Sequence, residues 1–417
     1  MIRLLFNISS PIFSLSLFVI SSAFFTTYIS IFSRLSGFSQ TSIGYFHSAF
    51  YFGYLVGSAK VEVLIRRVGH IRAFSTFSSV NIVVILLLGI LPVNPGFLIV
   101  ARFINGLCMA SLFIVVESWM LSKSDSKNRG QVLGIYMVAL YASQSGSQMI
   151  MKYVTIMSAT PFLIAAAFAA LAIFPLSITK SVSPELEKPT LTNVFKVLKI
   201  SALGSMSCFL SGCMLSSFYS FTPNFAQDYG LSISSIMSIT IAGGFLLQWP
   251  IGKMSDIFDR KKVVSMVALL AIIPCMVIFF LSTKDNIVMY SSFILGGLIF
   301  AVYPLGISQV CDHVETKNIH SALGLLSLIY GIGATAGPIL APFIINLIGL
   351  KGLYLYLALV SLVLFLFSLY FRSSRPAIAM EDQNDYVSVL PKMTMVGTRL
   401  DPRSNDDNIL ASEEGGE

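Results

Sequence analysis

Twelve long apolar runs, separated by short polar links, occupy most of the sequence. Each run approaches the ~20 residues that an α-helix needs to cross roughly 30 Å of hydrocarbon. Helices are the expected form because each one satisfies its own backbone hydrogen bonds in lipid. The pattern therefore predicts an all-α membrane protein with twelve transmembrane helices. The runs are approximately Pro11–Phe32, Thr41–Ala59, Ala73–Leu91, Phe97–Leu121, Gln131–Ile150, Pro161–Thr179, Ile200–Thr222, Ile233–Ile251, Val263–Ser282, Ile287–Val310, Ala322–Ile348 and Gly352–Phe371.

The composition favours a membrane protein and excludes several other classes. Of 417 residues, 55% are hydrophobic and only 11% are charged, which is too few charges to cover a soluble domain of this size. The five cysteines fall in or at the end of apolar runs and lack metal-ligand spacing. The sequence contains no HExxH, GxSxG or GxxxxGKS/T motif. We therefore predict no enzyme activity, no metal and no cofactor.

The basic residues are sorted unevenly between the two sides of the membrane. If the N-terminus is cytoplasmic, 22 of the 27 Lys and Arg residues fall on the cytoplasmic side, and only Arg34, Lys152, Lys284 and Lys351 fall on the far side. Cytoplasmic loops carry an excess of positive charge, so both termini are predicted to be cytoplasmic. The net charge of +7 arises from the membrane-embedded part of the chain, so we predict no nucleic-acid partner.

Two similar polar gaps lie 190 residues apart and indicate an internal duplication. They are Glu62–Arg72 and Gly252–Lys262, and both crowd basic residues between apolar runs. The Leu-Gly pair at 133–134 recurs at 323–324 with the same offset. The longest internal polar link divides the runs six and six. We predict two pseudo-symmetric six-helix bundles at residues 1–180 and 200–372, a cytoplasmic linker at 181–199, and a disordered, acidic cytoplasmic tail at 373–417.

The second polar gap resembles the signature loop of the major facilitator superfamily. That signature has a glycine, an aspartate four residues later, a basic residue, and then a glycine and further basic residues. Gly252, Asp256, Arg260 and Lys261 match it, whereas Asp259 replaces the second glycine.

The first gap matches this signature less well. Gly69 and Arg67 fit, but Glu62 stands in place of the glycine and Arg66 in place of the aspartate. Arg102, with a glycine four residues later, resembles the arginine motif of the family's fourth helix.

Four further stretches are similar to the YcaD-like subgroup of bacterial facilitators. They are residues 115–118 (VVES), 128–130 (NRG), 133–137 (LGIYM) and 248–252 (QWPIG). The resemblance covers residues 10–372. It implies the major facilitator fold and a transport function in the bacterial inner membrane, but it names no substrate.

In that family the charged loops gate the cytoplasmic side, so the resemblance implies contacts here that lock one conformation. An aspartate near a helix N-terminus gains roughly 0.3–1 kcal/mol, which is enough to bias a conformational equilibrium. The alternative is that the basic residues only fix topology. The residues predicted to gate or relay charge are Asp256, Arg260, Lys261, Arg66, Arg67, Glu117 and Arg129.

Two charges lie within the apolar runs, where a charge usually has a partner or a task. Glu117 is the only acid in any of the twelve runs. It is predicted either to take up a proton during transport or to pair with Arg66, Arg67 or Arg129, and its place near the cytoplasmic end favours the pair. Arg102 lies near the outer end, where three roles are open: binding an anionic substrate, assisting proton coupling, or snorkelling to the interface.

Polar side chains within certain runs predict a substrate cavity. Tyr141, Gln144 and Gln148 are spaced three and four residues apart, so they share one helix face. The resemblance implies that such a face lines a cavity between the two halves. The alternative is hydrogen bonding between helices, worth about 0.6 kcal/mol per contact. The residues assigned to the cavity or to coupling are Arg102, Tyr141, Gln144, Gln148, Gln248, Trp249 and Tyr330.

These features predict a monomeric secondary active transporter that moves a small polar or amphipathic solute across the bacterial inner membrane. Alternating access of two bundles and coupling to protons are the predicted mechanism, with the solute, protons and the lipid bilayer as partners. The alternative is a transporter-like sensor or scaffold that binds a ligand without net transport.

Overall fold

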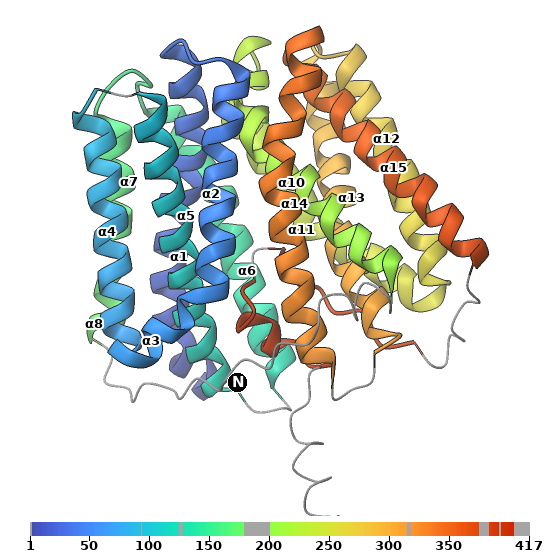
Figure 1. The fold of residues 1–417 in the computed structure, drawn as a ribbon, viewed down its shortest axis with the longest axis horizontal. Helices are drawn as coiled ribbons and strands as arrows, with labels where there is room; N and C mark the ends of the chain where they lie inside the picture. The colour runs from blue at the N-terminus through green and yellow to red at the C-terminus, as the bar shows by residue number, and fades with distance from the viewer. Residues whose placement is uncertain are drawn as a thin grey trace, which may run out of the picture.

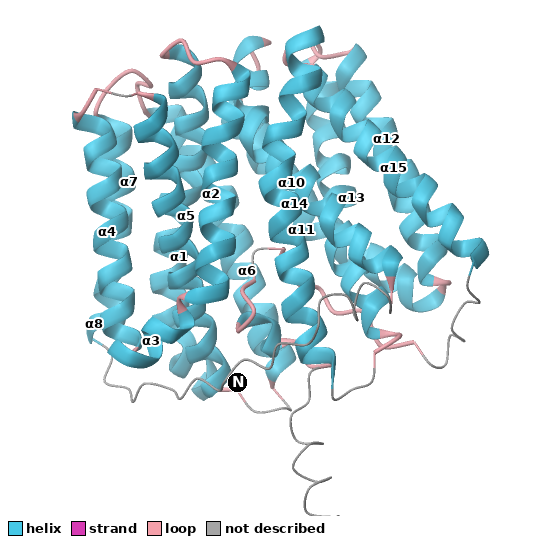
Figure 2. Ribbon diagram, in the orientation of Figure 1, coloured by secondary structure: helices cyan, strands magenta, loops and turns pink. Residues whose placement is uncertain are grey.

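The computed structural model describes residues 2–92, 94–124, 128–178, 201–314, 318–374, 383–391 and 393–403. This described part of the chain is helical and contains no strand (Figure 2). The predicted linker at 181–199 lies outside the described residues.

The helices fall into two groups that lie side by side (Figure 1). The N-terminal half forms α1 (Ile2–Leu35), α2 (Gln40–Lys60), α3 (Glu62–Val68), α4 (His70–Ile90), α5 (Pro95–Ser122), α6 (Arg129–Ser147), η1 (Gln148–Tyr153), α7 (Thr160–Leu171) and α8 (Ile173–Ile178). The C-terminal half forms α10 (Ala202–Asp228), α11 (Ile233–Ile257), α12 (Arg260–Phe280), α13 (Asp285–Cys311), α14 (Ile319–Ile348), α15 (Gly352–Ser374) and η4 (Gly397–Leu400).

Nine helical segments of the described chain are long and apolar enough to cross a membrane, fewer than the twelve predicted. The three predicted runs that do not qualify fall on α2, α6 and α10. These helices are rich in serine and other polar residues, many of which contact the other half or line the cavity described below. Their polarity therefore follows from facing protein rather than lipid.

Local sequence signals set several helix ends. Asn94 caps α5 by accepting a hydrogen bond from the Phe97 N–H at 2.9 Å, and Pro95 follows as the first helical residue. Asp259 caps α12 in the same way through the Lys261 N–H. Side-chain caps satisfy N–H groups that a helix start leaves unpaired, and proline suits that position because it has no N–H. Gly69, between α3 and α4, has φ of 86°, a conformation that glycine adopts without steric cost.

Glycines bring two helix pairs into close backbone contact, α2 with α5 and α11 with α13. A Cβ at any of these glycines would overlap a backbone carbonyl of the facing helix. The glycines in the second pair stand 190 positions after those in the first. They are Gly53 and Gly106 in the first pair, and Gly243 and Gly296 in the second.

The two halves also hydrogen-bond directly to one another. Ser30 of α1 donates to the Ser220 carbonyl of α10, and Arg34 donates to the Asn224 carbonyl at 3.0 Å; each pair is 190 residues apart. Arg34 also forms an ion pair of 2.6 Å with Asp228. These contacts lie at the end of the bundles away from the N-terminus, which we call the opposite side.

At the other end, the tail side, part of the C-terminal tail packs between the halves. Figure 1 shows this segment in red near α6 and α14. The prediction of a disordered tail from residue 373 is therefore wrong for residues 383–391 and 393–403. The reason is local composition: the nine acids of the tail all lie outside residues 386–400, and most of the apolar side chains of that stretch are buried. Residues 375–382 and 404–417 lie outside the described part.

Candidate functional site

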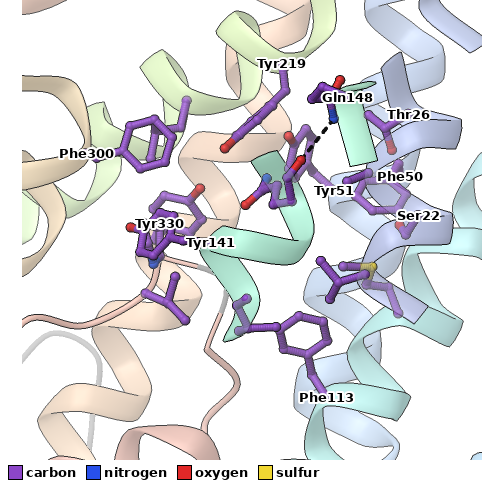
Figure 3. A pocket seen from close by; sticks show the side chains of 18 residues that line it. Ser22, Thr26, Phe50, Tyr51, Phe113, Tyr141, Gln148, Tyr219, Phe300 and Tyr330 are labelled. Atoms are coloured by element: carbon purple, nitrogen blue, oxygen red, sulfur yellow. Dashed lines mark hydrogen bonds between the residues drawn. The ribbon is translucent and has the colours of Figure 1, made fainter. Parts of the chain in front are cut away.

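A cavity lies between the two halves, lined by side chains of both. Aromatic rings from both halves line much of it, together with aliphatic side chains and with hydroxyl and amide groups (Figure 3). None of the described residues that line it is charged. The aromatic side chains are Phe50, Tyr51, Phe113, Tyr141, Tyr219, Phe300 and Tyr330, and the polar ones are Ser22, Thr26, Gln144 and Gln148.

The predicted face of α6 forms one wall of this cavity. Tyr141, Gln144 and Gln148 all line it, as does Tyr330 of α14 from the other half. The Gln148 side-chain oxygen accepts a hydrogen bond from Thr27 at 2.7 Å, which fixes the orientation of its amide. The Tyr141 ring packs against Phe300, with ring centroids 6.0 Å apart. The structure thus brings these four residues together, and their role in binding stays a prediction.

Gln248 and Trp249, which were assigned together, lie in different places. Gln248 is buried, and its side-chain oxygen lies 3.5 Å from the Tyr141 hydroxyl, directly behind the cavity wall. Trp249 is 63% exposed and stacks with Lys253, whose Nζ is 4.3 Å from the ring centroid. Its assignment to the central cavity is wrong, because neighbouring residues of a helix point about 100° apart.

Arg102 lies inside the protein rather than at its surface. Only 1% of it is exposed, and its guanidinium lies 4.4 Å from the centre of the Phe50 ring. Its Nη2 is 3.5 Å from the Thr26 hydroxyl, so both nearest partners also line the cavity. No acidic partner of Arg102 occurs in the part of the chain that the structure describes. Snorkelling to the interface is therefore not its conformation here.

Glu117 is fully buried near the tail side of α5. Its carboxylate accepts hydrogen bonds from the Tyr136 hydroxyl at 2.7 Å and from both the N–H and the hydroxyl of Thr394. Gly397 lies so close that a Cβ there would overlap the carboxylate. All these partners are neutral.

The favoured pairing of Glu117 with Arg66, Arg67 or Arg129 is not found among the described residues. Arg66 instead forms an ion pair with Glu62, 2.7 Å away and one helical turn earlier in α3. Arg67 is exposed on the same short helix, and Arg129 begins α6.

The second charged gap forms a compact ionic cluster on the tail side. Arg260 is 1% exposed and donates to both carboxylate oxygens of Asp312, at 2.5 and 2.6 Å, and to Asp256 at 3.2 Å. Burial raises the pKa of Asp312, although the Arg260 guanidinium opposes that shift. The Lys261 backbone N–H donates to the Asp259 side chain that caps α12, and the Lys261 side chain is buried; its gating role stays a prediction.

Sequence reasoning missed Asp312 and the tail residues of this region. Asp312 follows α13 directly, and an acid at the end of an apolar run was a signal that could have found it. Leu390 and Pro391 line the central cavity on its tail side. Thr394 contacts Glu117 across 277 positions of sequence, a separation that no local pattern reveals.

Comparison with known proteins places this geometry in context. The family model described as Major Facilitator Superfamily matches residues 12–247 and 232–386. An uncharacterized transporter of this type from Enterobacter sp. (strain 638) is 32% identical over 304 residues, covering 71% of this chain and 78% of the relative. The uncharacterized transporter YcaD of Escherichia coli O17:K52:H18 (strain UMN026 / ExPEC) is 27% identical over 356 residues, covering 84% and 91%.

Two solved structures share the fold. The nucleoside transporter NupG superposes with a TM-score of 0.74 at 16% sequence identity, covering 88% of this chain and 99% of that one. A bacterial homologue of the human lysosomal transporter Spinster, in an inward-facing and occupied conformation, gives a TM-score of 0.71 at 14% identity, covering 91% and 98%.

Proposed function

Because the chain belongs to the major facilitator superfamily, we propose that it is a secondary active transporter that moves a small solute by alternating access. The protein is an integral membrane protein of apolar helices. We place it in a bacterial inner membrane with both termini cytoplasmic, so that the tail side faces the cytoplasm. The excess of basic residues on that side supports this orientation.

The observation that carries alternating access is a symmetric set of hydrogen bonds between the halves. Ser48 donates to the Thr335 carbonyl, and Ser238 donates to the Ser145 carbonyl at 2.9 Å. Ser238 stands 190 positions after Ser48, and Thr335 stands 190 positions after Ser145. Two equivalent bundles related by a twofold axis would place these contacts at equivalent points. The same offset relates the glycine contacts within each half.

The state described here is closed on the opposite side by direct contacts of the two bundles. On the tail side, Leu390 and Pro391 of the C-terminal tail border the cavity. Rocking of the bundles would break the first set of contacts and bring the tail-side ends together. The central cavity would then be accessible from each side of the membrane in turn.

The cavity wall supports a particular class of solute. Rings such as Tyr51, Tyr141 and Tyr330 offer flat apolar faces, while hydroxyls and amides offer hydrogen bonds. An ionised ligand would have no charged side chain of the wall to neutralise it. We therefore propose a small, uncharged or weakly polar solute with a flat ring as the substrate.

Proton coupling is assigned to Glu117. A carboxyl group that is fully buried and surrounded by neutral donors loses its hydration without gaining a countercharge. Such a group is suited to bind a proton in one conformation and release it in another. We assign Arg102 a separate role: it holds the cavity wall through Phe50 and Thr26.

Reconstitution into proteoliposomes tests the proposal. Uptake of a panel of compounds, with and without a pH gradient, should show transport of uncharged ring compounds and not of carboxylates or phosphates. Tyr141→Ala should reduce that uptake, whereas Tyr290→Ala, which changes an exposed tyrosine of α13 (72% exposed), should leave it unchanged. Saturable binding without flux of any compound would instead favour the ligand-binding sensor.

A further inference from the structure

The tail segment, residues 383–403, is bound between the two bundles by contacts with both of them. At its start, the Asn384 N–H donates to Asp312 at 3.0 Å, and the Asn384 carbonyl accepts from Arg260 at 2.8 Å. The Tyr386 N–H donates to Asp256 at 2.8 Å. The tail segment thus attaches to the C-terminal bundle at the ionic cluster predicted to gate it.

The middle of the tail segment crosses to the N-terminal bundle. Leu390 and Pro391 border the central cavity, and Met393 lines a smaller pocket next to it. Thr394 then donates two hydrogen bonds to Glu117 of α5. Leu390, Met393 and Thr394 are each at most 5% exposed, so the crossing is a packed contact rather than a loose overlay.

The end of the tail segment returns toward the C-terminal bundle. Helix η4 packs against α5, α6 and α14, and Leu400 within it is fully buried. Arg403 forms an ion pair with Asp401 at 2.6 Å and donates to the Ser308 hydroxyl of α13 at 2.8 Å. The polar groups named here are therefore paired although they are buried between the bundles.

We propose that the tail segment is a removable plug that closes the tail side of the cavity and holds the two bundles apart there. This inference rests on the proposed transport function. While the tail segment is bound, a solute in the cavity has Leu390 and Pro391 between it and that side. The bundle ends cannot approach one another because η4 occupies the space between them. Transport therefore requires the tail segment to leave.

Binding of the tail segment and contact between the tail-side ends of the two bundles exclude each other. Asp256 and Glu117 are two of the residues predicted to gate or relay charge, and both are hydrogen-bonded to the tail segment. A Cβ at Gly252, the first residue of the signature loop, would overlap the ring of Tyr386. The tail segment thus lies on the surfaces that the two bundles need for contact with each other.

A reversible disulfide that holds the tail segment in place tests this proposal in the whole chain. An ideal Cβ at Gly130 of α6 lies 3.9 Å from Cγ of Pro402, so the two positions are neighbours and are chosen for the cross-link between Gly130→Cys and Pro402→Cys. The native cysteines are buried and unpaired, so they compete little. Oxidation should lower solute uptake by about tenfold or more, because only undocked molecules can turn over, and a reductant should restore it. Each single cysteine variant is the control. Unchanged uptake after complete cross-linking overturns the proposal.

A second experiment measures access to the cavity and does not depend on transport. A cysteine is placed in the wall by Ser22→Cys, and a membrane-impermeant maleimide is added from the tail side. Leu390→Asp, which buries a charge in the bound segment, should raise the labelling rate by about tenfold or more, because labelling follows the undocked fraction. Asp385→Asn, at an exposed position of the same segment, is the matched control.

These two readouts separate the plug from the transporter. Faster labelling by Leu390→Asp without any measurable flux would support the plug and contradict the proposed transport function. Equal labelling rates in Leu390→Asp and the parent protein would overturn the plug, whatever the transport assay gives.

Discussion

Replacing Arg260 by methionine should destabilise the protein far more than removing the charge of Asp256 beside it. The guanidinium is 1% exposed and serves two acids of very different burial, since the Asp312 side chain is 3% exposed and that of Asp256 is 34% exposed. It also donates to the carbonyls of Ser308 and Asn384. Arg260→Met would leave Asp312 buried without its countercharge.

The magnitude follows from the burial of each partner. Breaking a buried ion pair by removing one partner costs about 3–5 kcal/mol, because the remaining charge loses both hydration and neutralisation. The Asp256 contact joins residues one helical turn apart and is partly exposed, and such pairs contribute only about 0.3–0.5 kcal/mol. Arg260→Met should therefore cost several times more than Asp256→Asn.

The double variant Arg260→Met/Asp312→Leu is the decisive comparison. Replacing a whole buried ion pair by apolar residues of similar volume is often neutral in free energy. The double variant should therefore unfold at a higher temperature than Arg260→Met alone, measured by thermal unfolding of purified protein in detergent. The reasoning is refuted if Arg260→Met and Asp256→Asn lower the unfolding temperature equally, or if the second substitution adds to the loss.

Four further outcomes are expected. Asp256→Asn should slow transport at unchanged expression, because this carboxylate belongs to the proposed gate; normal turnover in proteoliposomes would remove that role. Glu117→Gln should abolish the dependence of uptake on a pH gradient, and a persisting dependence would assign the coupling proton to another group. Gly106→Val should destabilise the protein by about 1–3 kcal/mol through overpacking, whereas Gly146→Val, which meets open space, should unfold near the parent temperature. Trp249→Ala should leave the affinity for solute unchanged in a binding assay, since this ring lies outside the central cavity.

Residue spacing was sufficient to predict those features that depend on neighbouring residues alone. A run of about 20 apolar residues can satisfy the bilayer only as a helix, and nine of the predicted runs correspond to helices long and apolar enough to span it in the described chain. Helical spacing likewise brought Tyr141, Gln144 and Gln148 to one wall, and placed Asp256 beside Arg260. Spacing could not tell that Gln248 faces the cavity wall and Trp249 does not, because tertiary packing decides the orientation of their helix.

The buried partners of Arg260 and Glu117, in contrast, depend on tertiary packing. Asp312 meets Arg260 across 52 positions and Thr394 meets Glu117 across 277. Composition averaged over residues 373–417 also concealed the tail segment, since acids at both ends of the tail outweigh the apolar stretch between them. Composition averaged over a shorter window, of the length of the tail segment, would have revealed this apolar stretch.

The chemistry of the interface between the halves would keep the free-energy cost of the proposed opening small. Besides the Arg34 contacts, serine hydroxyls on the opposite side donate to backbone carbonyls of the other half. When the halves separate, a helical serine can turn its hydroxyl to the carbonyl one turn earlier in its own helix. Ser111 and Ser207 already form such bonds, to Leu107 and Leu203. A serine donor lost to the interface would thus be regained within its own helix. The interface serines would therefore support the two conformations of similar energy that the proposed alternating access requires, which large interlocking apolar side chains would not.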